Sequence, residues 1–376
     1  MPPEDRSAFR LLGHHPGRYI DVQEAGALLG RGATEAEDVL ERLVDVSLLE
    51  AREPGAYAFH DLVRHFARRL GQSEPATGDT EAVERLLDHY LARAENAGDT
   101  LFPGRARYSG PSGGPAGGLP EFGSRDAALK WLDQHRDSLL AAVDMAQSHG
   151  LLRHAGRLPR ELGFHSSIRS YDLEANVALE AGVGAARTLA DPALTRLNLT
   201  NLAMGQWRLG HIREAVARLE DALDISRSMN DARSAAECKA RLGQAYNSLG
   251  ELGHALRLSE EANRTARATG FARLDGSSLS TMSHVRARLG QFAEAAAAAR
   301  QALAVFDSIG EIQLSVDALA YLSRALEGTG RLEEALARAD EAVERCEQLR
   351  GPGGPPPAAR DPTATRRGTP HRRPCW

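Results

Sequence analysis

The chain has 376 residues, a length that suggests two or three domains. Hydrophobic residues make up 42% and charged residues 26%, a balance typical of a globular protein that excludes a chain disordered or membrane-embedded throughout. Only 5% of residues are aromatic, and alanine and leucine dominate the apolar share, so we expect a mostly helical protein. The formal net charge of −5 provides no overall attraction for nucleic acid.

Several chemistries lack their usual residues in this sequence. The only lysines, Lys130 and Lys239, lie outside any Gly-Lys-Ser/Thr loop, so we expect no nucleotide-binding P-loop. Three widely spaced cysteines and thirteen histidines show no metal-ligand spacing, and we assign no metal, no cofactor and no catalytic residue. No apolar run is long enough to span a membrane, and the N-terminus does not resemble a signal peptide, so a cytoplasmic protein is expected.

Residues 1–75 have the outline of a winged helix. Short helices are predicted over Asp21–Leu29 and Thr34–Val46, the second opened by a capping box from Thr34 to Glu37. The segments 48–51 and 56–59 flank Glu53-Pro54-Gly55 and predict a hairpin. Another helix is expected directly after Phe59. The order helix, helix, hairpin, helix favours a small winged-helix domain.

The middle of the chain is predicted to consist of two helical connectors with a linker between them. Residues 76–102 and 124–160 are predicted to be helical connectors, and the Gly/Pro-rich segment 103–123 between them is predicted to be a surface linker sensitive to proteases. A G-x-S-x-G match at 110–114 lies within it. A nucleophile elbow needs a strand and a helix around its serine, and prolines and glycines supply neither, so we regard the match as accidental.

Residues 161–350 contain an internal repeat of 40 residues. Gly210, Gly250, Gly290 and Gly330 recur in register, each followed by an alanine five residues later and another after seven more. Apolar residues recur at helical spacing on both sides of each glycine, which predicts two amphipathic helices joined by a glycine turn. A degenerate copy is expected around Ser170. After the repeats, the Pro- and Arg-rich segment 351–376 is predicted to be a disordered basic tail.

The repeats resemble tetratricopeptide repeats, whose pattern is nearly complete in Leu242-Gly243, Tyr246, Gly250, Ala255 and Ala262. The fold class expected is therefore mainly α: a tetratricopeptide-like α-solenoid preceded by a small degenerate winged-helix domain. In this repeat class the first helix of each unit lines the concave face. The resemblance implies a partner-binding groove formed by Thr200, Met204, Trp207, Arg208, Gln244, Asn247, His284, Arg288, Asp317 and Arg324.

The N-terminal part resembles the winged-helix end of NB-ARC modules in actinobacterial SARP-type regulators and related STAND signalling ATPases. The residues that carry the resemblance are Phe9–Gly17, Ala33–Leu49, Phe59-His60-Asp61-Leu62 and a connector at 127–143. The resemblance implies that His60 and Asp61 match a nucleotide-sensing motif. Because the P-loop of such regulators is missing here, these residues would sense a nucleotide only in trans, with a separate nucleotide-binding or DNA-binding chain.

Direct DNA reading by the winged helix is disfavoured by charge. The predicted helix 34–46 carries five acidic residues against Arg42 alone, and it would repel the phosphate backbone. The sequence therefore favours a non-enzymatic sensor and scaffold part of a STAND-type transcriptional regulator that binds a protein or peptide. A free-standing tetratricopeptide adaptor is the alternative, a DNA-binding regulator is disfavoured, and no nucleic acid or membrane partner is expected.

Overall fold

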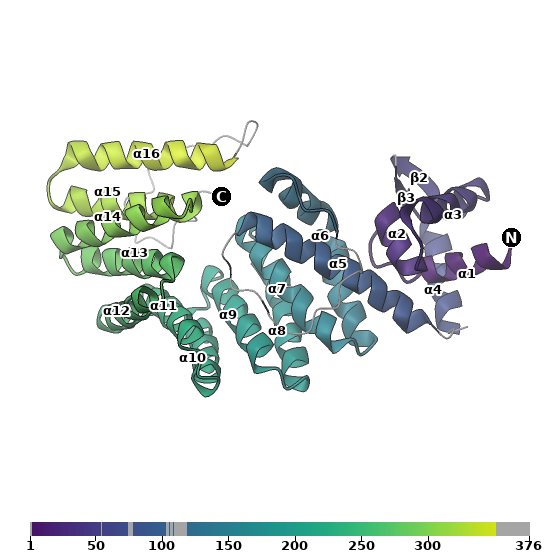
Figure 1. The fold of residues 1–376 in the computed structure, drawn as a ribbon, viewed down its shortest axis with the longest axis horizontal. Helices are drawn as coiled ribbons and strands as arrows, with labels where there is room; N and C mark the ends of the chain where they lie inside the picture. Colours follow the sequence, from purple (N-terminus) through teal and green to yellow (C-terminus); the bar gives the residue numbers. More distant parts are fainter. Residues whose placement is uncertain are drawn as a thin grey trace. The chain divides into compact units, whose positions relative to one another are not determined.

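The computed structural model describes residues 2–53, 55–73, 78–102, 105, 108 and 119–350. The chain divides into two compact units, Met1–Gly205 and Gln206–Trp376 (Figure 1). The predicted tail 351–376, most of the predicted linker 103–123 and the G-x-S-x-G match lie outside the described residues. No helix in the described part of the chain is both long and apolar enough to cross a membrane.

The first unit opens with a small α/β region. Its elements are α1 (Pro3–Leu12), β1 (Tyr19–Asp21), α2 (Val22–Leu29), α3 (Ala33–Asp45), β2 (Glu50–Glu53), β3 (Ala56–Ala58) and α4 (Asp61–Ser73). The predicted hairpin is present as β2 and β3, which pair antiparallel with an irregularity between Ala51 and Glu53. A strand that the sequence did not predict, β1, adds to the other edge of β3 and completes a sheet of order β1-β3-β2.

The predicted capping box at Thr34 is wrong. Helix α3 begins one residue earlier, and its N-cap is Gly32, which has no side chain to accept a hydrogen bond. The capping box lies instead at α2, where the Asp21 side chain accepts from the Glu24 amide and the Glu24 side chain accepts from the Asp21 amide. Both sites fit the local pattern of a polar N-cap with an acid three residues on, so the backbone path decides between them.

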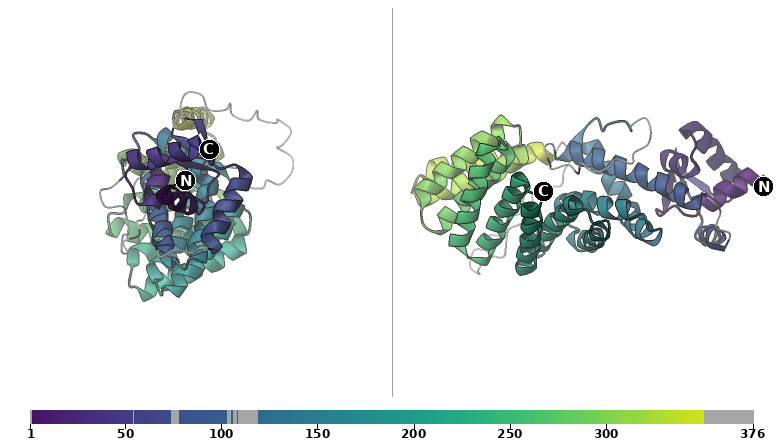
Figure 2. Two further views of the ribbon diagram at one scale, coloured as in Figure 1. Left: turned by 90° about the vertical axis from the view of Figure 1, so that its right-hand side faces the viewer. Right: turned by 60° about the horizontal axis from the view of Figure 1, so that its bottom comes forward.

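Five long helices complete the first unit: α5 (Asp79–Leu101), α6 (Arg125–Ser148), α7 (Leu152–Arg169), α8 (Asp172–Thr188) and α9 (Pro192–Arg208), the last of which crosses the unit boundary. One hydrophobic core extends from Ala8 and Phe9 of α1 to Ala185 of α8. The long α5 leaves the small N-terminal region and packs along α6 and α7 (Figure 2). Its fully buried Tyr90 and Leu87 belong to the same core as the N-terminal helices.

The second unit contains the repeats: α10 (Ile212–Ser228), α11 (Ala232–Leu249), α12 (Leu252–Ala268), α13 (Ala272–Arg288), α14 (Phe292–Ser308), α15 (Ile312–Gly328) and α16 (Leu332–Arg350). From α11 to α16, consecutive helices stack as antiparallel neighbours (Figure 1). The predicted fold class is confirmed: the chain is a mainly α solenoid of tetratricopeptide-like repeats, preceded by a small region with a three-stranded antiparallel sheet.

The turns between these helices recur every 20 residues. Left-handed backbone occurs at Gly150, Ser170, Ala190, Gly210, Asn230, Gly250, Gly270, Gly290, Gly310 and Gly330. The sequence predicted the turns at the four glycines spaced by 40 and at Ser170. It did not predict the five intermediate turns, where glycine is present at 150, 270 and 310 but alanine and asparagine replace it at 190 and 230 and interrupt the pattern.

Small residues let the repeat helices approach closely. The alanines that recur in register, Ala215, Ala255 and Ala295, have no exposed surface. Gly276 of α13 lies against the Phe306 ring of α14, where an added Cβ would come within 2.6 Å of a ring carbon. Close helix packing in the repeats therefore depends on side-chain size at a few positions in register.

Candidate ligand-binding surface

The first helices of the repeats form one face of the second unit. Helix α11 contacts α13 and α13 contacts α15, in addition to their contacts with sequence neighbours. Among the described residues, the second helices α12 and α14 make no comparable contact with each other. In a stacked array, the helices that approach one another most closely lie on the inner side of the curve, so α11, α13 and α15 line the concave face.

Polar contacts join these first helices to one another. Trp207 at the end of α9 donates its indole N–H to the Ser248 hydroxyl of α11, with Nε1 and Oγ 2.9 Å apart. Arg288 of α13 donates to Asn247 of α11, at 2.8 Å from the side-chain oxygen, and also bonds the Asn247 carbonyl. The steps between partners are 41 residues in both cases, one more than the sequence period.

A second set of contacts joins residues that are 37 positions apart in the sequence. The Asn247 amide nitrogen lies 3.2 Å from Nδ1 of His284, which is 37 residues later. The His284 ring stacks on Tyr321 of α15, with centroids 4.9 Å apart and planes 24° from parallel, after another 37 residues. We call the contacts of Trp207, Ser248, Asn247, His284, Arg288 and Tyr321 the inner-face ladder.

The ladder contains four of the residues predicted for the groove and two that the sequence reasoning missed. Trp207, Asn247, His284 and Arg288 were predicted. Ser248 and Tyr321 were missed because the register search compared positions 40 apart, whereas the contacts join positions 37 or 41 apart. Searching those two offsets among polar and aromatic residues would have found them.

The other predicted groove residues lie off the ladder. Arg208 and Gln244 are half-buried on α9 and α11, Asp317 is half-buried on α15, and Arg324 is exposed on the same helix. Thr200 is buried and donates its hydroxyl to the Arg196 carbonyl, 2.8 Å away within α9.

Thr200 and half-buried Met204 both lie in the first unit, and the other eight predicted residues lie in the second.

The inner face is rich in positive charge. Burial lowers the pKa of Arg241 on α11, with Glu237 opposing and the nearby cations Arg273 and Arg208 adding to the decrease. Arg273 is held by Glu311, with Nε and Oε1 2.9 Å apart. The guanidinium remains protonated at neutral pH because its unperturbed pKa is so high. Three arginines, Arg208, Arg241 and Arg273, thus lie close together on this face, with Glu237 and Glu311 beside them.

A further acid of this face, Asp317 on α15, has a shifted pKa. Burial raises the pKa of Asp317 to about 6. Burial also raises the pKa of the neighbouring Tyr321, with Asp317 adding to the increase and Arg324 opposing it. Asp317 therefore titrates close to neutral pH, and protonation at mildly acidic pH makes the α15 end of this face more positive.

A pocket of about 420 Å³ opens elsewhere in the second unit, beside the turn from α14 to α15 and along α16. Its lining includes Asp307, Glu311, Glu341 and Arg345. Arg345 is already paired with Asp307 and, at 2.8 Å, with Glu341. No residue of the inner-face ladder lines this pocket, and its arginine is neutralised internally, so the ladder is the better candidate surface.

The two residues of the predicted nucleotide-sensing motif lie at the start of α4. The His60 side chain is 57% exposed and pairs through Nε2 with Glu50 of β2. Asp61 is exposed and is the first residue of the helix. Both side chains are therefore open to solvent at the surface of the N-terminal region.

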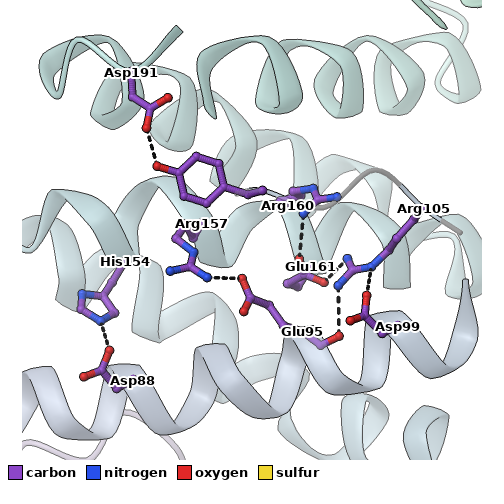
Figure 3. A network of polar contacts seen from close by, with 10 residues as sticks. Asp88, Glu95, Asp99, Arg105, His154, Arg157, Arg160, Glu161 and Asp191 are labelled. Atoms are coloured by element: carbon purple, nitrogen blue, oxygen red, sulfur yellow. Dashed lines mark hydrogen bonds and ion pairs between the residues drawn. The ribbon is translucent and has the colours of Figure 1, made fainter. Parts of the chain in front are cut away.

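Figure 3 shows a polar network inside the first unit, where α5 faces α7. Arg105 lies 2.5 Å from Glu161 and 2.8 Å from Asp99, and its side chain is only 4% exposed. Burial raises the pKa of Glu161, with the Arg105 and Arg160 guanidiniums acting in the opposite direction. Each cation has an acid within the network, so these contacts cross-link the helices.

The same network continues along α7 toward its N-terminus. Arg157 donates to Glu95 at 2.6 Å, and His154 Nε2 lies 2.9 Å from Asp88 Oδ1 (Figure 3). At the other side, Tyr108 donates its hydroxyl to Asp191, which precedes α9. Residues 105 and 108 come from the segment predicted as linker, so part of that segment is bound to the helices.

Comparison with known proteins gives two kinds of match. A family model described as a tetratricopeptide repeat matches residues 316–356. The regulatory protein AfsR of Streptomyces griseus is 33% identical over 253 residues, which cover 65% of this chain and 25% of AfsR. AfsR of Streptomyces coelicolor is 36% identical over 248 residues, covering 61% of this chain and 24% of AfsR. The chain thus spans about a quarter of the length of these relatives.

A solved structure is similar over most of the chain. A signal transduction ATPase with numerous domains (STAND) from Pyrococcus horikoshii, with a tetratricopeptide repeat sensor, is 16% identical with a TM-score of 0.43. The match covers 92% of this chain and 57% of that protein. The chain therefore contains tetratricopeptide repeats and is homologous, over about 60% of its length, to part of AfsR-type regulators.

Proposed function

We propose that this chain is the sensor and scaffold part of a STAND-type transcriptional regulator, and that its repeats bind a protein or peptide with acidic groups. The observation that carries the proposal is the inner-face ladder of α9, α11, α13 and α15. Homology to AfsR supports the regulatory role, and the ladder supports the mode of binding.

The ladder offers the kinds of group that recognise acidic peptides. The guanidinium of Arg288 in the ladder, and that of Arg324 near Tyr321 on the same face, present planar pairs of donors that match a carboxylate. Stacked His284 and Tyr321 and the indole of Trp207 provide rigid flat surfaces for apolar parts of a ligand. Because Asn247 already orients Arg288, less side-chain entropy is lost on binding.

A selection from a random peptide library on the full chain tests this proposal. We expect the enriched peptides to be acidic and to bind more weakly as salt rises. Arg324→Ala and Trp207→Ala should each weaken binding about thirtyfold, as truncation of an interface anchor typically costs about 2 kcal/mol. Arg300→Ala, an exposed arginine on the second helix α14, is the matched control and should bind normally.

Neutral or basic peptides in the enriched pool would contradict the proposal. So would a loss of binding in Arg300→Ala with normal binding in Arg324→Ala, because the outer face would then hold the ligand. Circular dichroism of each variant checks that the helices are retained. Arg324→Ala is the more specific test of the two inner-face variants, because the exposed Arg324 side chain contributes little to the fold.

The regulatory part of the proposal involves His60 and Asp61. We propose that a separate nucleotide-binding chain presents its nucleotide to these exposed residues. The chain alone should show no micromolar ADP or ATP binding by calorimetry. His60→Ala should weaken ADP binding by a complex with such a partner, whereas a free-standing adaptor, the alternative function, predicts no dependence of its binding on His60.

A further inference from the structure

A histidine and two carboxylates meet where α6 passes the start of α2, both in the first unit. The Nε2 atom of His135 lies 3.7 Å from Asp21 Oδ2 and 3.4 Å from Glu24 Oε1. The three ligand atoms are all within 4.8 Å of one another. His135 is far from the two acids in sequence, so only the fold brings the three together.

The capping box orients the two acids toward His135. Asp21 uses Oδ1 to accept the Glu24 amide at 2.7 Å, and Glu24 uses Oε2 to accept the Asp21 amide at 2.8 Å. Each carboxylate therefore has one oxygen occupied by the cap of α2. The other two oxygens, Asp21 Oδ2 and Glu24 Oε1, are the ones that face the imidazole.

The imidazole presents a lone pair to these oxygens in its neutral form. Its Nδ1 lies 2.8 Å from the Trp131 carbonyl, which accepts, so the ring proton is assigned to Nδ1. The ring also stacks on the Trp131 indole, with centroids 4.4 Å apart and planes 18° from parallel. A hydrogen bond from one ring nitrogen to a backbone carbonyl is the usual support of a metal-binding histidine, because it fixes the other nitrogen toward the ion.

Glu24 Oε1 provides an independent indication of a missing partner. The Glu24 side chain is 2% exposed, and Oε1 is buried without a hydrogen-bond partner in the structure. Buried carboxylate oxygens are nearly always satisfied. The distances of 3.4 and 3.7 Å to Nε2 are too long for good hydrogen bonds. Two ligands of one tetrahedral ion with bonds of about 2.0–2.2 Å are about 3.3–3.6 Å apart, so the Glu24 distance falls within this range and the Asp21 distance lies just beyond it.

The surroundings suit a cation. Glu24 supplies a carboxylate whose side chain is only 2% exposed, and its other oxygen, Oε2, lies 3.2 Å from Nε2 of His15. Burial lowers the pKa of nearby His89, so that ring contributes little positive charge at neutral pH. Asp21 is 37% exposed, which leaves one side of the cluster open to solvent for entry of an ion and for a water ligand.

We infer that Asp21, Glu24 and His135 bind one divalent transition-metal ion, with Zn²⁺ as the reference ion. One imidazole nitrogen with two carboxylate oxygens suits Zn²⁺, Co²⁺ or Mn²⁺ better than Mg²⁺ or Ca²⁺, which prefer oxygen ligands alone. The ion takes the place that a proton on Nε2 would fill, so metal binding competes with protonation of that nitrogen. The bound ion cross-links the start of α2 to α6 and thereby stabilises the N-terminal region.

Metal binding by the full chain, stripped with chelator and dialysed, tests the inference. We expect one Zn²⁺ per chain by calorimetry and by elemental analysis, and a Co²⁺ absorption spectrum of a site with low coordination number. His135→Gln and Glu24→Gln should each weaken Zn²⁺ binding by more than about tenfold. Zn²⁺ should raise the unfolding temperature of the native chain and not that of His135→Gln.

His254→Gln is the matched control. His254 lies 3.1 Å from Glu251 on an exposed helix turn of α12, a histidine–acid pair without a second carboxylate, and its loss should leave Zn²⁺ binding unchanged. Equal Zn²⁺ binding by the native chain and His135→Gln would overturn the inference. The inference would also be overturned if the native chain bound no Co²⁺ and nitrogen NMR showed His135 as an imidazolium. This second test uses only the native chain, so it does not depend on the folding of a variant.

Discussion

The two units bury their interiors differently. The first has one large core that extends from α1 to α8, and it also buries charged residues such as Arg105 and Glu161. The repeats of the second unit bury theirs in separate clusters made largely of alanine and leucine, each shared by neighbouring helices. Stability is therefore expected to be spread over long distances in the first unit and to be local, repeat by repeat, in the second.

The largest change in stability is expected when a buried ion pair of the first unit is broken. Glu161→Ala leaves Arg105 and Arg160, both with side chains 4% exposed, without their shared acid. Breaking such a buried pair should lower the free energy of unfolding by about 3–5 kcal/mol. Chemical denaturation followed by circular dichroism measures the change.

The matched control for this variant is Glu261→Ala in the second unit. Glu261 lies 2.7 Å from Lys239, but its side chain is 40% exposed, and the loss should be below about 1 kcal/mol. Similar losses in the two variants would show that the buried network contributes no more than a surface ion pair, and the contrast drawn between the units would fail.

A change of one methyl group tests how local the repeats are. Gly276→Ala places a Cβ within 2.6 Å of the Phe306 ring, and the overpacking should cost about 1–3 kcal/mol. Hydrogen exchange should become faster in α13, α14 and α15 and stay unchanged in α5 and α7. Faster exchange throughout the first unit as well would mean that the units unfold as one.

A pH series tests the acid on the inner face. Burial raises the folded-state pKa of Asp317 to about 6, above its unfolded value, so the folded chain prefers the protonated acid. The ionised carboxylate of Asp317 therefore lowers the free energy of unfolding. This effect is absent at pH 3 and grows as pH rises through the range from about 4 to 6. Asp317→Asn should match the native chain at the acidic end and be more stable at pH 7, by an amount of the order of 1 kcal/mol, since one pKa unit is about 1.4 kcal/mol and the side chain is partly solvated.

The smallest expected effect concerns the 20-residue turns. Ala190 adopts φ 52°, a left-handed conformation that is strained for alanine. Ala190→Gly should raise the free energy of unfolding by about 0.5–1 kcal/mol, as measured by thermal or urea denaturation. Asn230→Gly, at φ 55°, should change it less, because asparagine tolerates this conformation. A loss of stability in Ala190→Gly would contradict the strain argument.

The sequence by itself determined most of the second unit. The glycines at 210, 250, 290 and 330 mark the helix turns, and the alanines that follow them are buried, because a repeated unit meets the same neighbours each time. The hairpin of β2 and β3 was also predictable, since its turn residues and strand residues are adjacent in the chain. In these places the contacts that define the structure are local or periodic.

Only the tertiary structure decided the rest. The capping box at Asp21 and Glu24 and the strand β1 depend on the backbone path of the N-terminal region. The ladder steps of 37 and 41 residues depend on how the repeat helices cross, which the 40-residue period does not specify. His135 meets Asp21 and Glu24 because α6 packs beside the N-terminal region, and no spacing in the sequence encodes that approach. Long-range polar contacts depend on how the helices pack against one another. Hydrophobic periodicity in the sequence shows which face of each helix is buried, but it does not give the angles at which the helices cross.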